Sequence, residues 1–447
     1  MKNSIRKIAL TAILGLSVIA PIATFANHYT SNQSEKSANL ESEILQSLNV
    51  EKMYNNIKFL SKTPRVAGSI EENEAIDFIN KQFESYGYKT EIQEFMFTNY
   101  TAPHNIKLDV KNFSKKLNPQ ALEYSVSGQV AAEVIPVGLA KKNDLQKLNL
   151  SGKIALVQRG EISFQEKMLN VMEKGAVGII FYNNEAGTIM GSLGEANHSF
   201  VPSVFLTQDE GEALVKHFKK YSRAKASLNI AGASSTEKTS HNVIATKKPN
   251  HSTGKNPMND ILVISSHHDS VAGAPGANDN ASGTAMTLEL ARVLKNIPTD
   301  TEIRFITFGA EEFGLLGSTH YVDHLSKSEI SRMVANFNLD MVGSKDAGDL
   351  ILQTLDDKPN LVTDLAQAAS KKLNGEPTPY NQGDRSDHVA FAKVGIPAAL
   401  FIHNPPEPWY HKPEDTIDKI SKEKLQDVSE IVSIAVWNQI KIDRQVK

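Results

Sequence analysis

The sequence predicts an α/β protein whose core is an open, mostly parallel mixed sheet that helices sandwich. After about residue 240, apolar strand-like segments alternate with helical ones, and several of them are apolar almost throughout, as expected of strands buried on both faces. The helix after Ser282 carries one apolar stripe, Met286, Leu290, Val293 and Leu294. In such sheets ligands bind beyond the carboxyl ends of the strands. The strand candidates are NVIAT, DILVIS, EIRFITF, NFNLDMV and IPAALFI.

Residues 1–26 have the pattern of a secretory signal peptide. Three basic residues among the first seven precede an apolar run over residues 8–20, which Pro21 and the small-residue ending TFA follow. An uncleaved membrane anchor is the alternative, but the short, proline-interrupted run favours cleavage. We therefore expect a secreted protein. Residues 27–45 are polar and serine-rich, which predicts a flexible lead-in or a propeptide remnant.

The overall composition excludes several classes of protein. Hydrophobic residues make up 40% and charged residues 22% of the 447, which is typical of globular domains. A net charge of −3, or −6 once residues 1–26 are removed, gives no basic field for nucleic acid. The chain has no cysteine, so thiol nucleophiles and thiolate metal sites are excluded. We expect a monomer that does not associate with membranes after cleavage.

Three further segments divide the chain. Residues 46–116 hold a helix with Ile76, Ile79 and Phe83 on one stripe and form the first part of the main domain. Residues 117–235 form a self-contained α+β unit without an evident cluster of His, Asp or Glu. Its segment GKIALVQRGEISFQEKMLNVMEKGAVGIIFYNN resembles the protease-associated domain, which implies an inserted lid or docking module. Residues 236–447 complete the main domain.

Residues suited to metal binding follow the predicted strands in this last segment. Singly, each has an ordinary explanation as a helix cap, a solvated turn or a satisfied histidine. Five such positions at successive strand ends are difficult to explain in that way. They are His267, Asp279, the pair Glu311 and Glu312, Asp340 and His411.

The residue types indicate which metal the site takes and how many ions. Imidazole and carboxylate ligands without sulfur suit zinc, with cobalt or manganese as substitutes. Three carboxylates and two histidines exceed the three protein ligands of one catalytic zinc, so two ions bridged by one aspartate are expected. Since successive residues point in different directions, one of Glu311 and Glu312 can be a ligand while the other is a general base.

Strand geometry predicts which of the two adjacent histidines in SHHD faces the metal. Side chains alternate between the faces of a strand, so residues two apart lie on the same side. His267 and Asp269 should therefore face the metal together, and His268 should point the other way.

Five motifs in order resemble those of the secreted dizinc aminopeptidases, and the resemblance covers nearly all of the chain after the signal peptide. The Bacillus-type enzyme with an inserted protease-associated domain is the nearest match. The resemblance implies the phosphorylase/hydrolase-like zinc peptidase fold. The motifs are SHHDSVAGAPGANDNASG, FGAEEFGLLGSTHYV, NFNLDMVG, GDRSDHVAFAKVGIPA and WYHKPEDT.

The resemblance assigns a role to each site residue. His267, Asp279 and Asp340 would hold one zinc ion; Asp279, Glu312 and His411 would hold the other. Glu311 would be the general base, Asp269 would support His267, and Tyr410 would hydrogen-bond the carbonyl oxygen as the tetrahedral intermediate forms. Tyr410 as an aromatic packed at the pocket rim remains an alternative. A cis peptide bond between Asp279 and Asn280 is also implied.

The expected activity is removal of N-terminal residues from peptides with a free amino terminus. A carboxypeptidase or dipeptidase on the same dizinc scaffold is an alternative, as are a single-zinc cyclase-type relative and, in another class, a non-catalytic receptor or binding module. The side-chain preference is not indicated by the sequence. Arg385 could contact the substrate or form a structural salt bridge. Asp387 and His388 are expected to be structural or to contact the metal ligands rather than the metal. No role in the site is expected for His320, His324 or His403.

Overall fold

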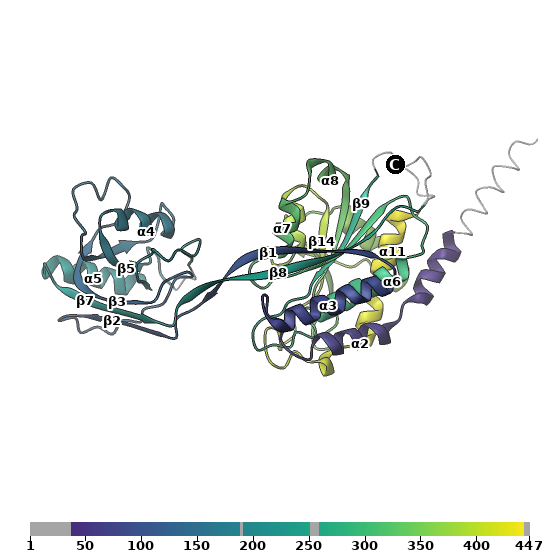
Figure 1. Cartoon of the computed structure of the whole chain (residues 1–447), viewed down its shortest axis with the longest axis horizontal. Helices are drawn as coiled ribbons and strands as arrows, with labels where there is room; N and C mark the ends of the chain where they lie inside the picture. The colour runs from purple at the N-terminus through teal and green to yellow at the C-terminus, as the bar shows by residue number, and fades with distance from the viewer. Residues whose placement is uncertain (1–36, 188–190, 251–258, 442–447) are drawn as a thin grey trace, which may run out of the picture. The chain divides into compact units, whose positions relative to one another are not determined.

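The computed structural model describes residues 37–187, 191–250 and 259–441, which form two compact units (Figure 1). The first unit combines residues 1–93 and 241–447, and the second comprises residues 94–240. Strands β1 (Lys89–Thr101) and β8 (Ser234–Lys247) connect the two units. The expected insertion at 117–235 lies inside the second unit, which begins earlier because β1 continues into it.

The first unit is built on an eight-stranded mixed sheet in the order β1-β8-β10-β9-β11-β14-β12-β13. Its centre is parallel: β9 pairs with β10 and β11, and β11 pairs with β14. Strand β8 is antiparallel to β10, and β12 is antiparallel to β14. The strands are β9 (Ile261–His267), β10 (Glu302–Phe308), β11 (Met333–Leu339), β12 (Asp349–Thr354), β13 (Tyr380–Gln382) and β14 (Ala398–Asn404).

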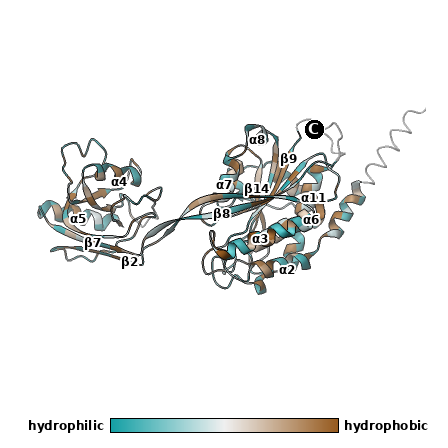
Figure 2. Ribbon diagram, viewed as in Figure 1, coloured by the Kyte–Doolittle hydropathy of each residue, from teal (hydrophilic) through white to brown (hydrophobic). Residues whose placement is uncertain are grey.

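Helices cover both faces of this sheet, because its central strands are apolar on both sides. Leu262 and Ile264 of β9 pack into one hydrophobic cluster with α2, α3, α6, α9 and α11, while Ile261 and Val263 pack into a second cluster with α7 and α10. Figure 2 shows hydrophobic residues along the central strands. The predicted α/β sandwich is confirmed. The helices are α2 (Val50–Leu60), α3 (Ile70–Ser85), α6 (Ala281–Leu294), α7 (Leu316–Asp323), α8 (Lys327–Arg332), α9 (Leu361–Asn374), α10 (His388–Lys393) and α11 (Lys422–Ile440), with a 3₁₀ turn at Ile417–Lys419.

Helix α6 is the element that places the site against the core. It begins at Ala281, and the side chain of Asn280 just before it accepts a hydrogen bond from the Gly283 N–H and so caps the helix. Nearly all of its residues are buried, including the predicted stripe. The first residues beyond its N-terminus are therefore held rigidly beside the ends of β9 and β11.

The second unit is an α+β domain with its own core. Its six-stranded sheet has the order β2-β7-β3-β4-β5-β6, in which β3 to β6 are parallel and β7 is antiparallel to its neighbours. Met168 and Val171 of its helix α4 are fully buried. Its elements are β2 (Asn105–Val110), β3 (Gly128–Pro136), β4 (Lys153–Gln158), α4 (Phe164–Glu173), β5 (Ala176–Tyr182), β6 (Ser203–Leu206), α5 (Gln208–Lys220) and β7 (Lys225–Ala231).

The N-terminal region differs in part from the sequence prediction. The predicted signal peptide, 1–26, lies outside the described residues, as do residues 27–36 of the expected lead-in. Residues 37–47 are helical, however, and Ile44 is fully buried in the main core with Leu40 and Leu45 against it. The polar composition of this segment concealed an apolar stripe at helical spacing. No helix within the described ranges is long and apolar enough to cross a membrane.

Candidate metal centre

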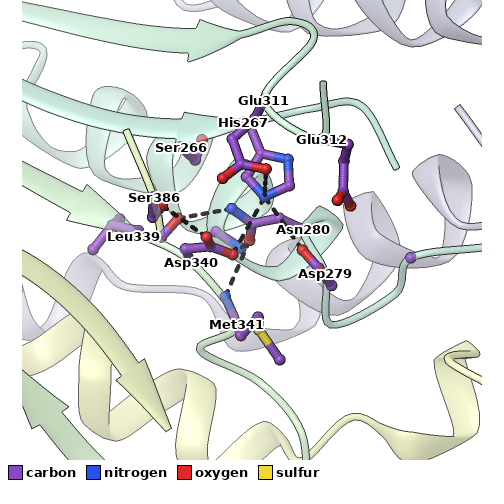
Figure 3. A network of polar contacts seen from close by, with 12 residues as sticks. Ser266, His267, Asp279, Asn280, Glu311, Glu312, Leu339, Asp340, Met341 and Ser386 are labelled. Atoms are coloured by element: carbon purple, nitrogen blue, oxygen red, sulfur yellow. Dashed lines mark hydrogen bonds and ion pairs between the residues drawn. The ribbon is translucent and has the colours of Figure 1, made fainter. Parts of the chain in front are cut away.

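The predicted ligands meet at the carboxyl ends of the parallel strands (Figure 3). His267 is the last residue of β9, and Asp340 directly follows β11. Glu311 and Glu312 lie in the turn after β10. Asp279 stands two residues before α6. The fifth position, His411, comes from the loop after β14.

Asp279 lies between the two histidines. Its Oδ1 is 3.2 Å from His267 Nε2, and its Oδ2 is 3.1 Å from His411 Nε2. Asp340 Oδ1 lies 3.3 Å from His267 Nε2, and Glu312 Oε2 lies 3.0 Å from His411 Nε2. Two groups of three ligand atoms therefore share one aspartate: His267–Asp279–Asp340 and Asp279–Glu312–His411.

These residues fit a pair of bound cations. Asp340 Oδ1 and Glu312 Oε1 are buried and accept no hydrogen bond from any described residue. Buried carboxylate oxygens are costly unless they are paired or coordinate a metal. Within each group the ligand atoms lie within 4.8 Å of one another, and they are the nitrogen and oxygen donors that zinc accepts.

The electrostatics of the cluster also favour cations. Burial raises the pKa of Glu312 to about 7, and the neighbouring Asp279 carboxylate adds to the shift. Burial likewise raises the pKa of Glu311, although His267 opposes this. Burial disfavours the charged ring of His411, but its contacts with Asp279 and Glu312 outweigh this and raise its pKa to about 10. The carboxylates thus repel one another and attract positive charge.

Asp269 contacts two parts of the site. Its Oδ1 lies 3.4 Å from His267 Nδ1, the ring nitrogen remote from the cluster. Its two oxygens also accept hydrogen bonds from the backbone N–H groups of Glu311 at 3.1 Å and Glu312 at 3.2 Å. One buried carboxylate therefore orients both the histidine ring and the glutamate turn; the second of these contacts was not expected from the sequence.

His268 lies away from the cluster. Its Nδ1 is 3.1 Å from Thr307 Oγ1, and its Nε2 is 3.6 Å from Glu72 Oε1. Its side chain is buried between β10 and α3. Adjacent histidines thus lie on opposite sides, as strand alternation predicts.

Two polar residues that were not singled out from the sequence fix Asp340 and its surroundings. Ser386 Oγ donates a hydrogen bond of 2.8 Å to Asp340 Oδ2, which leaves Oδ1 facing His267 (Figure 3). Asn280 Nδ2 donates to the Leu339 carbonyl at 2.9 Å. The peptide bond between Asp279 and Asn280 is cis, as the resemblance implied. Ser386 lies in the motif GDRSDHVAFAKVGIPA, but nothing in that motif indicated a role for its side chain.

A cavity of about 320 Å³ opens beside the cluster. Tyr410 lines it, stacks on the His411 ring with centroids 3.9 Å apart, and is 40% exposed. Arg385 lies at its exposed wall. Five carboxylates line the same space, the four of the cluster and Asp384, together with the apolar side chains of Met341, Leu400 and Ile402.

The other histidines noted in the sequence, and Asp387, lie outside the groups of candidate ligands. The rings of His320 on α7 and His324, which follows α7, are tilted against each other with centroids 4.0 Å apart. His403 is buried, and burial lowers its pKa to about 4. His388 Nε2 lies 3.0 Å from the Gly383 carbonyl oxygen. Asp387 is fully buried, which raises its pKa to about 7.

An α/β sheet with a histidine–carboxylate cluster at its strand ends is the arrangement expected of a metal-dependent hydrolase. The profile of Peptidase family M28 matches residues 242–436, and that of the PA domain matches residues 124–214. Aminopeptidase YwaD of Bacillus subtilis (strain 168) is 38% identical over 407 residues, which cover 88% of this chain and 86% of that protein. Leucine aminopeptidase 2 of Trichophyton equinum is 30% identical over 75% of this chain and 67% of that protein.

Solved structures agree with these matches. The aminopeptidase from Aneurinibacillus sp. strain AM-1 superposes with a TM-score of 0.77 at 52% identity, over 91% of this chain and 97% of that one. BSAP, a zinc aminopeptidase from Bacillus subtilis, does so with a TM-score of 0.62 at 37% identity, over 89% and 97%. The chain belongs to peptidase family M28 and carries a PA domain. The resemblance to the Bacillus-type enzymes and the expectation of a peptide hydrolase are confirmed.

Proposed function

We propose that the protein is a secreted aminopeptidase that holds two zinc ions and removes N-terminal residues from peptides. The observation that carries this proposal is the pair of three-residue ligand groups that share Asp279. Relatives similar over nearly the whole chain are named aminopeptidases, and one solved structure is titled a zinc aminopeptidase. The signal-peptide pattern of residues 1–26 supports secretion.

His267, Asp279 and Asp340 would hold one ion, and Asp279, Glu312 and His411 would hold the other. Zinc in such a site acts as a Lewis acid and lowers the pKa of water, and cobalt or manganese can replace it. Asp269 Oδ1, 3.4 Å from the remote His267 nitrogen, would accept a hydrogen bond from the N–H at that nitrogen and so keep the other nitrogen free to be a ligand.

Glu311 is the general base. It belongs to a third candidate ligand group, with His267 and Glu312, but to neither of the two that share Asp279; its carboxylate lines the cavity and its Oε2 is 3.9 Å from His267 Nε2. Glu311 accepts a proton from the attacking water and then donates it to the leaving amine. Burial raises the pKa of Glu311 in the metal-free site, which is the direction that a carboxylate carrying a proton between the two steps requires.

Tyr410 donates a hydrogen bond to the oxygen that becomes negative as the tetrahedral intermediate forms. Burial and the nearby carboxylates raise the pKa of its hydroxyl, so it keeps its proton and remains a donor. Its position on the cavity wall beside His411 supports this role over simple packing.

The relatives support an aminopeptidase over a carboxypeptidase, since proteins similar over most of this chain are named aminopeptidases. Asp279, Glu311, Glu312 and Asp340 line the cavity, and two zinc ions would offset their four negative charges, so the charge of the cavity does not distinguish the two activities. Arg385 on the exposed wall is the feature that would favour the alternative. We further propose a monomer with peptides as its only partners, since the net charge of −3 provides no basic field for nucleic acid.

The test is hydrolysis of a panel of aminoacyl-nitroanilides by the purified protein, with and without a chelator. We expect activity that the chelator abolishes and zinc restores. Peptides blocked at the amino end should be resistant, whereas peptides blocked at the carboxyl end should be cleaved. The reverse pattern would establish a carboxypeptidase. Mass analysis of secreted protein tests cleavage of the leader.

A further inference from the structure

Residues 268–279, here called the ligand loop, connect the end of β9 to the start of α6. His267 precedes this loop, and Asp279 ends it, so its path decides whether Asp279 can face both histidines. Two buried ionic side chains from elsewhere in the chain bind its backbone. One is Arg65, between α2 and α3, and the other is Asp415, in the loop before the 3₁₀ turn.

Arg65 is 1% exposed, and its guanidinium group binds backbone carbonyls at both ends of the ligand loop. Nε donates to the His268 oxygen at 2.7 Å, Nη1 to the Pro275 oxygen at 2.6 Å, and Nη2 to the Gly276 oxygen at 3.0 Å. Its own backbone N–H donates to Ser270 Oγ at 2.9 Å. These contacts span about 200 positions of sequence and fix the loop against the α2–α3 connection.

Asp415 holds the other end of the loop. It is 1% exposed, and its two oxygens accept the backbone N–H groups of Asn278 at 2.8 Å and Asp279 at 3.0 Å. Its backbone oxygen accepts the Ala277 N–H at 3.2 Å. Because Asp415 follows His411 by four residues, it joins the backbone of one candidate ligand to the loop that carries another.

We propose that Arg65 and Asp415 are positioning residues that hold the ligand loop so that Asp279 faces His267 and His411 at once. Neither side chain belongs to a ligand group, so each acts through Asp279. Charged groups are expensive to bury, and here their hydrogen bonds are made to the backbone around a ligand rather than to another ion. Groups that orient ligands in this way set metal affinity.

The test measures zinc affinity as well as activity, and it rests on the proposed dizinc function. Arg65→Met removes all the guanidinium donors and keeps an unbranched stem; Asp415→Asn keeps the shape but turns an amide NH₂ toward one backbone N–H. We expect each variant to bind zinc about 10- to 100-fold more weakly than the wild type in competition with a chromophoric chelator. Circular dichroism of the metal-free proteins should match the wild type.

Arg304→Met is the matched control. Arg304 has a side chain 13% exposed in the same unit and binds Glu302, Glu329 and Tyr321, none of which is in the ligand loop. Its loss should lower thermal stability while leaving zinc affinity unchanged. An equal loss of affinity in this control would show that destabilisation alone weakens zinc binding, and would overturn the proposal.

Wild-type zinc affinity in both positioning variants would also overturn it. If Arg65→Met does not fold, Asp415→Asn decides by the same measurement. Failure of the wild type to bind zinc would instead refute the proposed dizinc function. A wild type that binds two zinc ions, alongside variants that do so equally well, would refute this inference alone.

Discussion

Replacing Glu311 separates the chemistry of the site from its metal binding. Asp279 and Asp340 reach His267 Nε2 at 3.2 and 3.3 Å, whereas Glu311 Oε2 is 3.9 Å away, and both shared ligand groups are complete without it. Glu311→Ala should therefore retain both zinc ions. A general base contributes about 10²–10⁴-fold to the rate. This corresponds to about 2.7–5.4 kcal/mol at about 1.36 kcal/mol per tenfold change.

The assay is the kcat for a reactive aminoacyl-nitroanilide, together with zinc content by atomic emission on the same samples. We expect kcat to fall by about 10²–10⁴-fold, with zinc content unchanged and KM altered little. Glu311→Gln, which keeps the size of the side chain, serves as the isosteric control and should behave in the same way. Full activity in either variant would refute the base assignment. Loss of one zinc ion would show that Glu311 is a ligand.

Three further predictions concern the histidines and the tyrosine. His267→Ala should lose zinc, whereas folded His268→Tyr should keep it, since His268 lies beside Thr307 and Glu72; equal zinc loss would refute the division of roles. Tyr410→Phe should lower kcat by about 10²–10³-fold with zinc retained, and an unchanged kcat would leave Tyr410 a packing residue. Zinc affinity should rise with pH between 6 and 8. The reason is that contacts with carboxylates raise the pKa of metal-free His411 to about 10, so zinc must displace a proton from this ring. A calorimetric titration that shows no proton release on zinc binding would contradict this.

Much of the fold was predictable because local patterns agreed with it. The apolar runs of β9 and β10 are buried on both faces, as their composition indicated, and the α6 stripe faces the core. The N-terminal helix at 37–47 was missed because its few apolar residues stand among serine and glutamate. Its burial depends on a core assembled from α2, α3 and α11.

The sequence was sufficient to predict the candidate ligand residues, because histidine and carboxylate side chains follow successive apolar strands whose carboxyl ends must meet at one edge of the sheet. Strand alternation also separated His267 from His268. Three features were decided by the tertiary structure alone. Asp279 lies between two histidines, and Asp269 binds the Glu311–Glu312 turn. Arg65 and Asp415 form hydrogen bonds with the backbone of the ligand loop. The contacts of Asp269, Arg65 and Asp415 are side-chain hydrogen bonds to backbone groups up to about 200 residues away. Such bonds depend on which distant segments the fold brings together. Because nearly every residue has the same backbone N–H and carbonyl groups, the sequence does not indicate which of them a side chain will bind.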